Sequence, residues 1–138
     1  MRRLPNNAVA KALVTLLSAE MPDIPVTDCI DESVSLPYIS IGSVMTADDR
    51  VKSGTVMSCK IQIHIWSDYE GKSEVDGIAQ RIAETLQADN TVIDMSDDDF
   101  AIVDGGIESY DTYEEDTYGY NGIINLSLIV EDIKNKED

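Results

Sequence analysis

The sequence predicts an α+β domain in which one mostly antiparallel β-sheet, of about four to five strands, carries two helices on one face. Two segments place apolar residues at helical spacing, and four others alternate with a period of two. Their order along the chain is helix, hairpin, helix, hairpin. Because the chain has 138 residues, we expect a single domain that occupies residues 1–138.

Helical spacing defines the two predicted helices. The first covers residues 7–21 and ends before Pro22, with Val9, Leu13, Leu16 and Leu17 on one face. The second begins at Ser73 and ends near residues 89–90. Ser73 and Asp76 have the spacing of a capping box. Its apolar stripe consists of Val75, Ile78, Ala79, Ile82 and Leu86.

Strict alternation defines the predicted strands. The clearest, residues 55–66, places three isoleucines on one face and polar residues with His64 and Trp66 on the other. Residues 36–44 form its hairpin partner across a polar turn at 46–54. Residues 100–110, with a bulge at the glycine pair 105–106, and residues 118–130 form the second hairpin. Residues 24–35 are a surface connection with a short edge strand at 26–30, and residues 131–138 are a charged tail.

Acidic residues dominate the charge of the chain. The formal net charge is −17, of which residues 1–60 contribute −1 and residues 61–138 contribute −16. So negative a chain cannot neutralise phosphates or bind an anionic membrane by bulk attraction. We therefore expect neither sequence-specific DNA binding nor membrane association. No apolar run approaches the length of a membrane span, and the amino end lacks a signal-peptide pattern.

Ten carboxylates and no Lys or Arg lie within residues 94–116. We expect part of this segment to form a long acidic loop between the last two strands, with Tyr110, Tyr113, Glu114, Glu115 and Asp116 at or near its tip. One interpretation is a solvated loop that keeps the protein soluble. The other is a docking arm for a basic partner, because tyrosine supplies contact area at low entropic cost.

The sequence offers no support for catalysis. His64 is the only histidine, and no serine or cysteine lies in a nucleophile motif. Cys29 and Cys59 are expected to be free thiols rather than a zinc site. The acidic residues after Asp94 lack the spacing of a calcium-binding EF-hand loop. We therefore expect no catalytic residue, no metal and no cofactor.

Three short motifs nevertheless point to a family. They are Leu36-Pro37-Tyr38 at the start of a strand, His64-Ile65-Trp66-Ser67 at the end of the next, and a helix with Ile78-Ala79 and Leu86. In this order and spacing the chain resembles the tail-completion or tail-terminator proteins of long-tailed bacteriophages and prophages. The resemblance extends from the first helix to the last strand. The acidic hairpin is longer than that of many relatives.

The resemblance implies a structural virion protein without catalysis. It would assemble in the host cytoplasm as a hexameric ring on the tail tube and join the tail to the head connector or a head-completion protein. DNA would pass through the ring without specific binding. Trp66 and His64 would contribute to an interface, and Asp97, Asp98 and Asp99 would line a DNA-repelling channel. The alternative is an acidic, non-enzymatic adaptor or inhibitor that binds a basic protein through the hairpin from Tyr110 to Tyr120.

Overall fold

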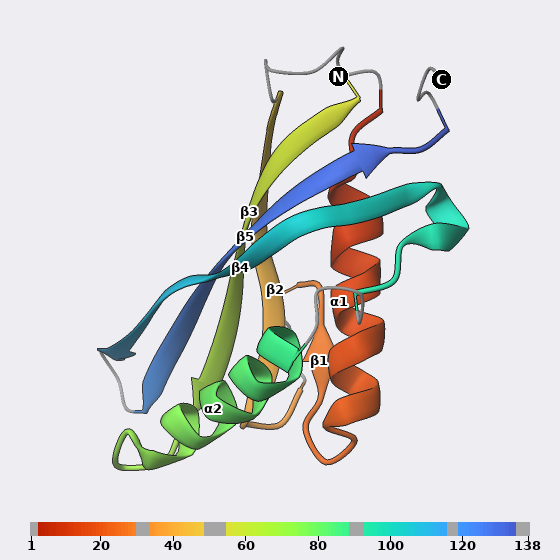
Figure 1. Ribbon diagram of the computed structural model, residues 1–138. Coiled ribbons are helices and arrows are strands. Elements are labelled where there is room, and N and C mark those ends of the chain that lie inside the picture. The colour runs from red at the N-terminus through yellow and green to blue at the C-terminus, as the bar shows by residue number, and fades with distance from the viewer. Residues whose placement is uncertain (1–2, 30–33, 49–54, 89–92, 116–118, 135–138) are drawn as a thin grey trace.

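The fold is a curved five-stranded sheet with two helices, seen here in a computed structural model that describes residues 3–29, 34–48, 55–88, 93–115 and 119–134 (Figure 1). The strand order in the sheet is β1-β2-β3-β5-β4. Only the two-residue pairing of β1 with β2 is parallel. In chain order the elements are α1 (Asn6–Glu20), β1 (Val26–Thr27), β2 (Tyr38–Asp48), β3 (Val56–Ser67), α2 (Ser73–Ala88), a 3-10 turn (Ser96–Asp98), β4 (Phe100–Glu114) and β5 (Tyr120–Asp132). The predicted α+β class is confirmed.

Strand β3 lies at the centre of the sheet because it pairs with β2 on one side and with β5 on the other. Its buried side chains alternate with half-exposed ones along almost the whole strand. Ile61, Ile63 and Ile65 are each at most 1% exposed and belong to one continuous core. The predicted isoleucine face is therefore the inner face of the sheet.

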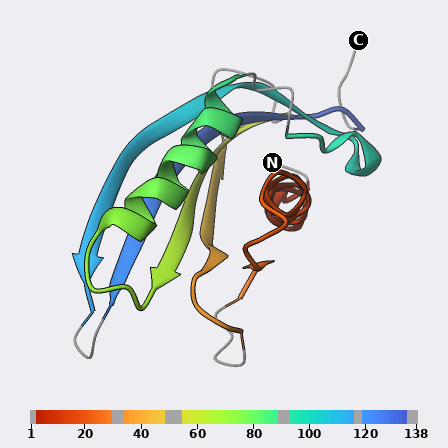
Figure 2. The ribbon, with the colours of Figure 1, turned by 90° about the horizontal axis from the view of Figure 1, so that it is seen from below.

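Both helices cover this inner face, as predicted. Helix α1 contacts β1 and β2, whereas α2 contacts β3, β4 and β5. Figure 2 shows both helices on the concave side of the sheet. Val9, Leu13 and Leu17 of α1 join the same core as Val75 and Ile82 of α2. In the described part of the chain, neither helix is long and apolar enough to cross a membrane.

Two side chains connect the ends of the helices to the sheet. Asn6, in the first turn of α1, donates to the carbonyl of Val44 at 2.9 Å and accepts from the hydroxyl of Thr46 at 2.7 Å. Helix α2 begins at Ser73, as predicted. The carboxylate of Asp76, however, accepts hydrogen bonds from β4. The expected capping role of Asp76 is thus replaced by a contact with the sheet.

Strand β4 differs from its prediction at the glycine pair. The irregularities in its pairing with β5 lie between Ile102 and Asp104 and between Ile107 and Ser109, on either side of the glycines. Gly105 itself is paired with Leu128. A Cβ at Gly105 would lie 2.6 Å from the carbonyl oxygen of Ser127, so a glycine is needed for close approach of the two strands.

We predict that Ile63→Ala lowers the free energy of unfolding by about 2–5 kcal/mol, because Ile63 is fully buried and its loss leaves a cavity in the core. The neighbouring Gln62→Ala, on the opposite face of β3, is the matched control and should change it by about 1 kcal/mol or less. Urea unfolding followed by Trp66 fluorescence measures both. Equal losses for the two variants would contradict the assignment of the faces.

Candidate protein interface

The outer face of the sheet is a surface that both helices leave bare. No helix covers it within the described ranges of the chain, since both helices lie on the inner face. The alternating residues of β3 and β5 that point away from the core are mostly half-exposed. They form cross-strand rows because paired residues in neighbouring strands share a face.

One row brings aromatic residues from different strands together. Tyr38 of β2 pairs with Trp66 of β3, and their ring centroids are 6.3 Å apart. The ring of His64 stacks on Trp66 at 5.5 Å and an interplanar angle of 9°. Trp66 Nε1 donates to the hydroxyl of Ser40 at 3.0 Å. The side-chain amide of Asn121 donates to the carbonyl of Ile65 at 3.2 Å, so the row is held in place from β5 as well.

Tyr113 lies in the same row of the sheet. It pairs with Asn121, which in turn pairs with Trp66. The predicted interface residues Trp66, His64 and Tyr113 therefore come together at one end of the outer face. Tyr113 is 52% exposed, so its ring is available to a partner.

Apolar side chains continue along this outer face. Met45 is 58% exposed and pairs with Lys60, while Ile123 and Ile129 are half-buried. A hollow of about 440 Å³ lies near the middle of the face. Its lining consists of Ser43, Met45, Lys60, Ile61, Gln62, Glu108, Ser109, Asn125 and Leu126. Lys60 and Glu108 form an ion pair across it. The hydrogen bond from Lys60 lowers the pKa of Glu108.

The acidic hairpin is paired strand rather than a long loop. Glu114 of β4 pairs with Tyr120 of β5, and the backbone N–H of Glu115 donates to the carbonyl of Gly119 at 3.0 Å. Gly119 has a φ of 91° and lies against the backbone of Ser67 and Asp68. Glu114 and Glu115 are exposed, whereas Asp116 lies outside the described residues. The expected free loop was wrong because pairing with β5 extends β4 by four residues beyond Tyr110.

Tyr110 does not share a face with Tyr113. Its phenol donates a hydrogen bond of 2.7 Å to Asp76 of α2, and the hydroxyl of Thr112 donates to the same carboxylate oxygen at 3.1 Å. A groove of about 270 Å³ between α2 and β4 is lined in part by Tyr110 and Ile107. Burial and the nearby Asp76 carboxylate raise the pKa of Tyr110 to about 12. Tyr110 therefore connects the hairpin to α2 on the inner side.

The acidic turn around Asp97, Asp98 and Asp99 is partly compensated by two cations near the start of α1. Lys11 forms an ion pair with Asp98 at 2.8 Å. Arg3 donates to the carbonyls of Asp98 and Asp99 at 3.0 and 2.9 Å. It also bonds the buried carboxylate of Asp132, which raises the pKa of Arg3.

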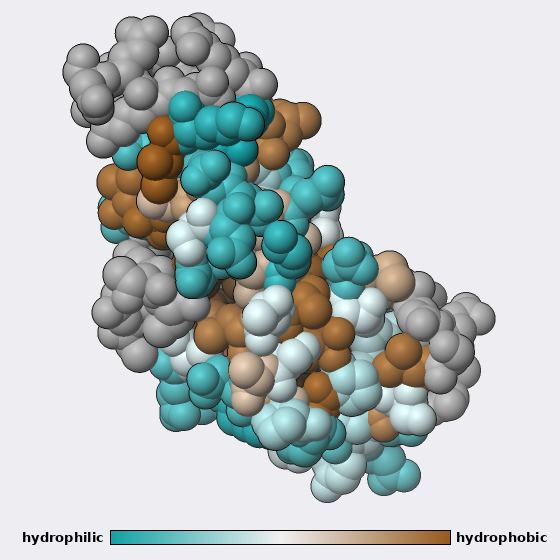
Figure 3. Space-filling model, turned by 90° about the vertical axis from the view of Figure 1, so that its right-hand side faces the viewer, coloured by the Kyte–Doolittle hydropathy of each residue, from teal (hydrophilic) through white to brown (hydrophobic). Residues whose placement is uncertain are grey.

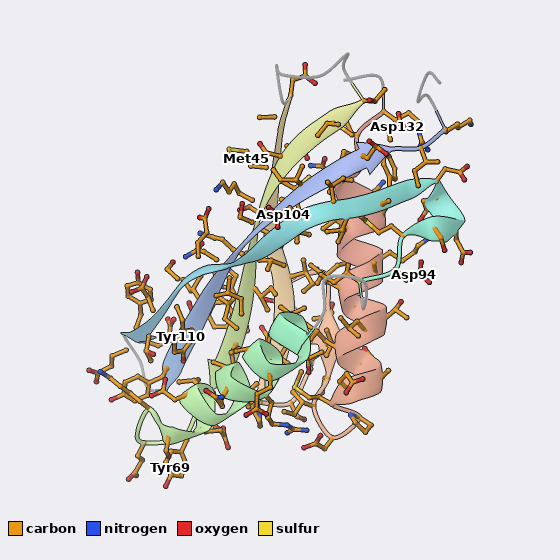
Figure 4. The ribbon with its side chains drawn as sticks, viewed as in Figure 1. Met45, Tyr69, Asp94, Asp104, Tyr110 and Asp132 are labelled. Carbon is orange, nitrogen blue, oxygen red and sulfur yellow. The ribbon has the colours of Figure 1, made fainter. Side chains whose placement is uncertain are left out.

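The acidic turn and the hairpin tip lie at opposite ends of β4. This strand has 15 residues, which corresponds to roughly 50 Å at the usual rise of a strand. Figure 4 shows Asp94 and Tyr110 toward these two ends. The two predicted acidic sites are therefore separate surfaces of the molecule.

Several residues of the outer face were not predicted. Asn121, Ile123 and Ile129 join it because β5 pairs with β3 over its whole length. These residues alternate along the last strand, and Asn121 pairs with Trp66. That alternation, combined with the pairing register, is the pattern from which their position on the outer face could have been predicted. Among the described residues, no group of three or more His, Cys, Asp or Glu side chains is arranged to hold a metal ion.

A sheet with helices on one face and a bare face that carries a row of aromatic side chains is typical of proteins that work by assembly with other proteins. The chain matches the family model described as tail completion protein gp17 over residues 7–131. It therefore belongs to this family of structural proteins of the bacteriophage tail. No curated protein matches the sequence.

Solved structures share the fold at low sequence identity. A chain of the virion of a native gene transfer agent particle is 19% identical, with a TM-score of 0.57, over 91% of this chain and 92% of that one. The gp17 protein of bacteriophage SPP1 is also 19% identical, with a TM-score of 0.54, over 96% of this chain and 95% of its own. Both similarities extend over nearly the whole domain.

We predict that Tyr110→Phe lowers the free energy of unfolding by about 1 kcal/mol at neutral pH, because the bond to Asp76 is lost. The folded protein keeps the phenol proton up to about pH 12, whereas an unfolded chain loses it near pH 10. The stability contributed by Tyr110 is thus present below pH 10 and lost between pH 10 and pH 12.

Urea unfolding at a series of pH values checks this expectation. The difference between wild type and Tyr110→Phe should stay constant up to pH 9 and shrink between pH 10 and pH 12. Tyr113→Phe on the outer face is the matched control for the loss of one phenol. A difference that does not change with pH would show that Asp76 and burial do not hold the proton on Tyr110.

Proposed function

We propose that this protein closes the end of a phage-type tail tube as a hexameric ring and joins the tail to the head connector. Membership of the tail completion family supports a place at the tail. The bare outer face is the observation that favours assembly, because it exposes Met45 and Tyr113 and half-exposes Trp66. A ring needs two different contact surfaces on each subunit. Because the helices cover only one face of the sheet, the domain has two different sides, the helical side and the outer face of the sheet.

The partners of the ring would be further copies of this chain, the last tube ring and the head connector or a head-completion protein. The hairpin tip, with Tyr113, Glu114 and Glu115, is the candidate surface for a basic region of one of these neighbours. Asp116 is part of the same candidate surface by sequence. Tyr110 serves the stability of the hairpin instead, since it is bonded to Asp76.

The acidic turn would form part of the wall of the channel through the ring. The carboxylates of Asp97 and Asp99 are exposed, and Asp98 shares its charge with Lys11. An acidic wall repels the phosphates of DNA, so DNA would pass through without being bound. This role agrees with the charge of −17 and requires no base-reading side chain.

Deletion of the gene from the phage, prophage or gene transfer agent that carries it tests the proposal. Electron microscopy of the lysate should show filled heads separate from tails. Tails longer than normal would further identify a protein that stops tube growth. Supplying the wild-type gene from a plasmid is the control and should restore joined particles. Intact, infectious particles from the deletion strain would contradict the proposed function.

A further inference from the structure

Contact between copies of so acidic a protein must avoid its carboxylates. Each copy carries a formal charge of −17, and like charges placed opposite each other across an interface disfavour association. Thirteen of the 27 carboxylates lie on β4, on α2 with the loop before it, and on the turn from Asp94 to Asp99. Glu20, Asp23 and Asp28 lie between the end of α1 and the residue that follows β1, and Asp23 is paired with Arg81. The surfaces that carry few charges are thus the places where two copies meet at least electrostatic cost.

The exposed side of α1 is one such surface. Within Asn6–Glu20 the only charged residues are Lys11 and Glu20, and Lys11 is already paired with Asp98. A groove of about 530 Å³ runs between α1 and β1. It is lined by Asn7, Ala10, Lys11, Val14, Thr15, Val26, Thr27 and Asp28. In Figure 3, which faces this side, much of the lower half is pale or brown rather than teal.

The outer face of β2, β3 and β5 is the second such surface. On it, these three strands carry one lysine, Lys60, and one glutamate, Glu131, with Glu108 of β4 paired to the lysine. The remaining side chains are apolar, aromatic, amide or hydroxyl groups such as Ile129, Gln62 and Ser58. Most of this surface can therefore be buried without leaving an unpaired charge. Asp104 and Asp111 of β4, which pair with Ile129 and Ile123, lie at its edge.

The two surfaces lie on opposite sides of the subunit, and the sheet face is long enough to accommodate the helix. The α1 side lies over the inner face of the sheet, so it points away from the outer face. A helix of 15 residues is about 22 Å long, and three strands present a surface about 14 Å wide and about 40 Å long. One helix therefore fits along this face, and small residues on α1, such as Ala10 and Ser18, permit close packing.

From these observations we infer that each copy in the ring packs its α1–β1 side against the outer sheet face of the next copy. This inference rests on the proposed ring. The contact is heterologous, because two different surfaces meet, and its repetition with a six-fold rotation gives a ring rather than a two-fold dimer. Helix α1 of one copy would supply the layer that the outer face of its neighbour lacks. The acidic α2 and β4 sides would remain outside the contact.

Cysteine cross-linking in assembled particles tests the inference. Particles are made by a strain without the gene, complemented with Ser18→Cys/Ser58→Cys in a Cys29→Ser background. Cys29 is the exposed native thiol, whereas Cys59 is buried. Ser18 lies on the exposed side of α1 and Ser58 on the outer face of β3. A short bismaleimide should yield a ladder of cross-linked copies up to the complete ring.

The matched control is Gln80→Cys/Ser58→Cys. It keeps the cysteine on β3 and moves the second cysteine from α1 to the acidic α2. Gln80 is exposed on α2. We expect about tenfold more cross-linked product from the first pair than from the control. If the first double variant forms no particles, Thr15→Cys/Gln62→Cys probes the same two surfaces.

The outcomes separate this inference from the proposed function. Joined particles in which the control pair cross-links as well as or better than the α1 pair would overturn the inference and leave the function intact. Joined particles without a ladder from either α1 pair would also overturn it. Joined particles from the strain that lacks the gene altogether would remove the proposed function itself.

Discussion

The burial of the isoleucine face of β3 is the interaction on which the rest of the structure depends. β3 occupies the centre of the sheet, and its inner side chains contact the layer that both helices form. Because side chains alternate along a strand, burying Ile61, Ile63 and Ile65 turns Gln62, His64 and Trp66 outward. The alternation that buries the isoleucines in the core thus also determines which residues of β3 are exposed on the outer face. Shifting the register by one residue would exchange the two faces.

Charge is distributed unevenly over the surfaces of the domain. Four of the described cations, Arg3, Lys11, Lys60 and Arg81, each form an ion pair within the chain. The pair of Lys11 compensates charge between α1 and the acidic turn, and the pair of Lys60 compensates charge on the outer face. On α2, β4 and the acidic turn, carboxylates still outnumber the basic side chains. An acidic protein can then associate with copies of itself through neutral surfaces and still repel DNA from its acidic ones. Fold and electrostatics therefore support the same mode of assembly.

Periodicity was sufficient to predict most of the fold. The helix at Asn6–Glu20 and the strand at Val56–Ser67 are displaced by only one residue from their expected positions, because strong apolar patterns set both. The placement of Trp66 and His64 on the face opposite the isoleucines followed from the same alternation. The acidic hairpin was mistaken for a loop because Asp, Glu and Gly have low strand propensity. Pairing with the strongly alternating β5 overrides that local preference.

The functions of individual site residues depended on contacts that no local pattern contains. Tyr110 and Tyr113 were grouped as neighbours in a loop, yet in a strand they lie on opposite faces, and only Tyr113 remains on the outer face. The pair of Arg3 and Asp132 joins residues 129 positions apart. The same guanidinium donates to the carbonyls of Asp98 and Asp99, so it connects the acidic turn to the segment before α1. Such long-range pairs can be predicted only once the topology of the fold is known. The family resemblance, in contrast, rested on short motifs in order and was confirmed over residues 7–131.

Electron cryomicroscopy of intact particles tests the central claim most directly, because it locates this chain and counts its copies. The account predicts one ring of six copies between the last tube ring and the head connector, with helix α1 of each copy facing the sheet of the next. Copies distributed along the whole tube, or particles whose tails lack the protein, would contradict it.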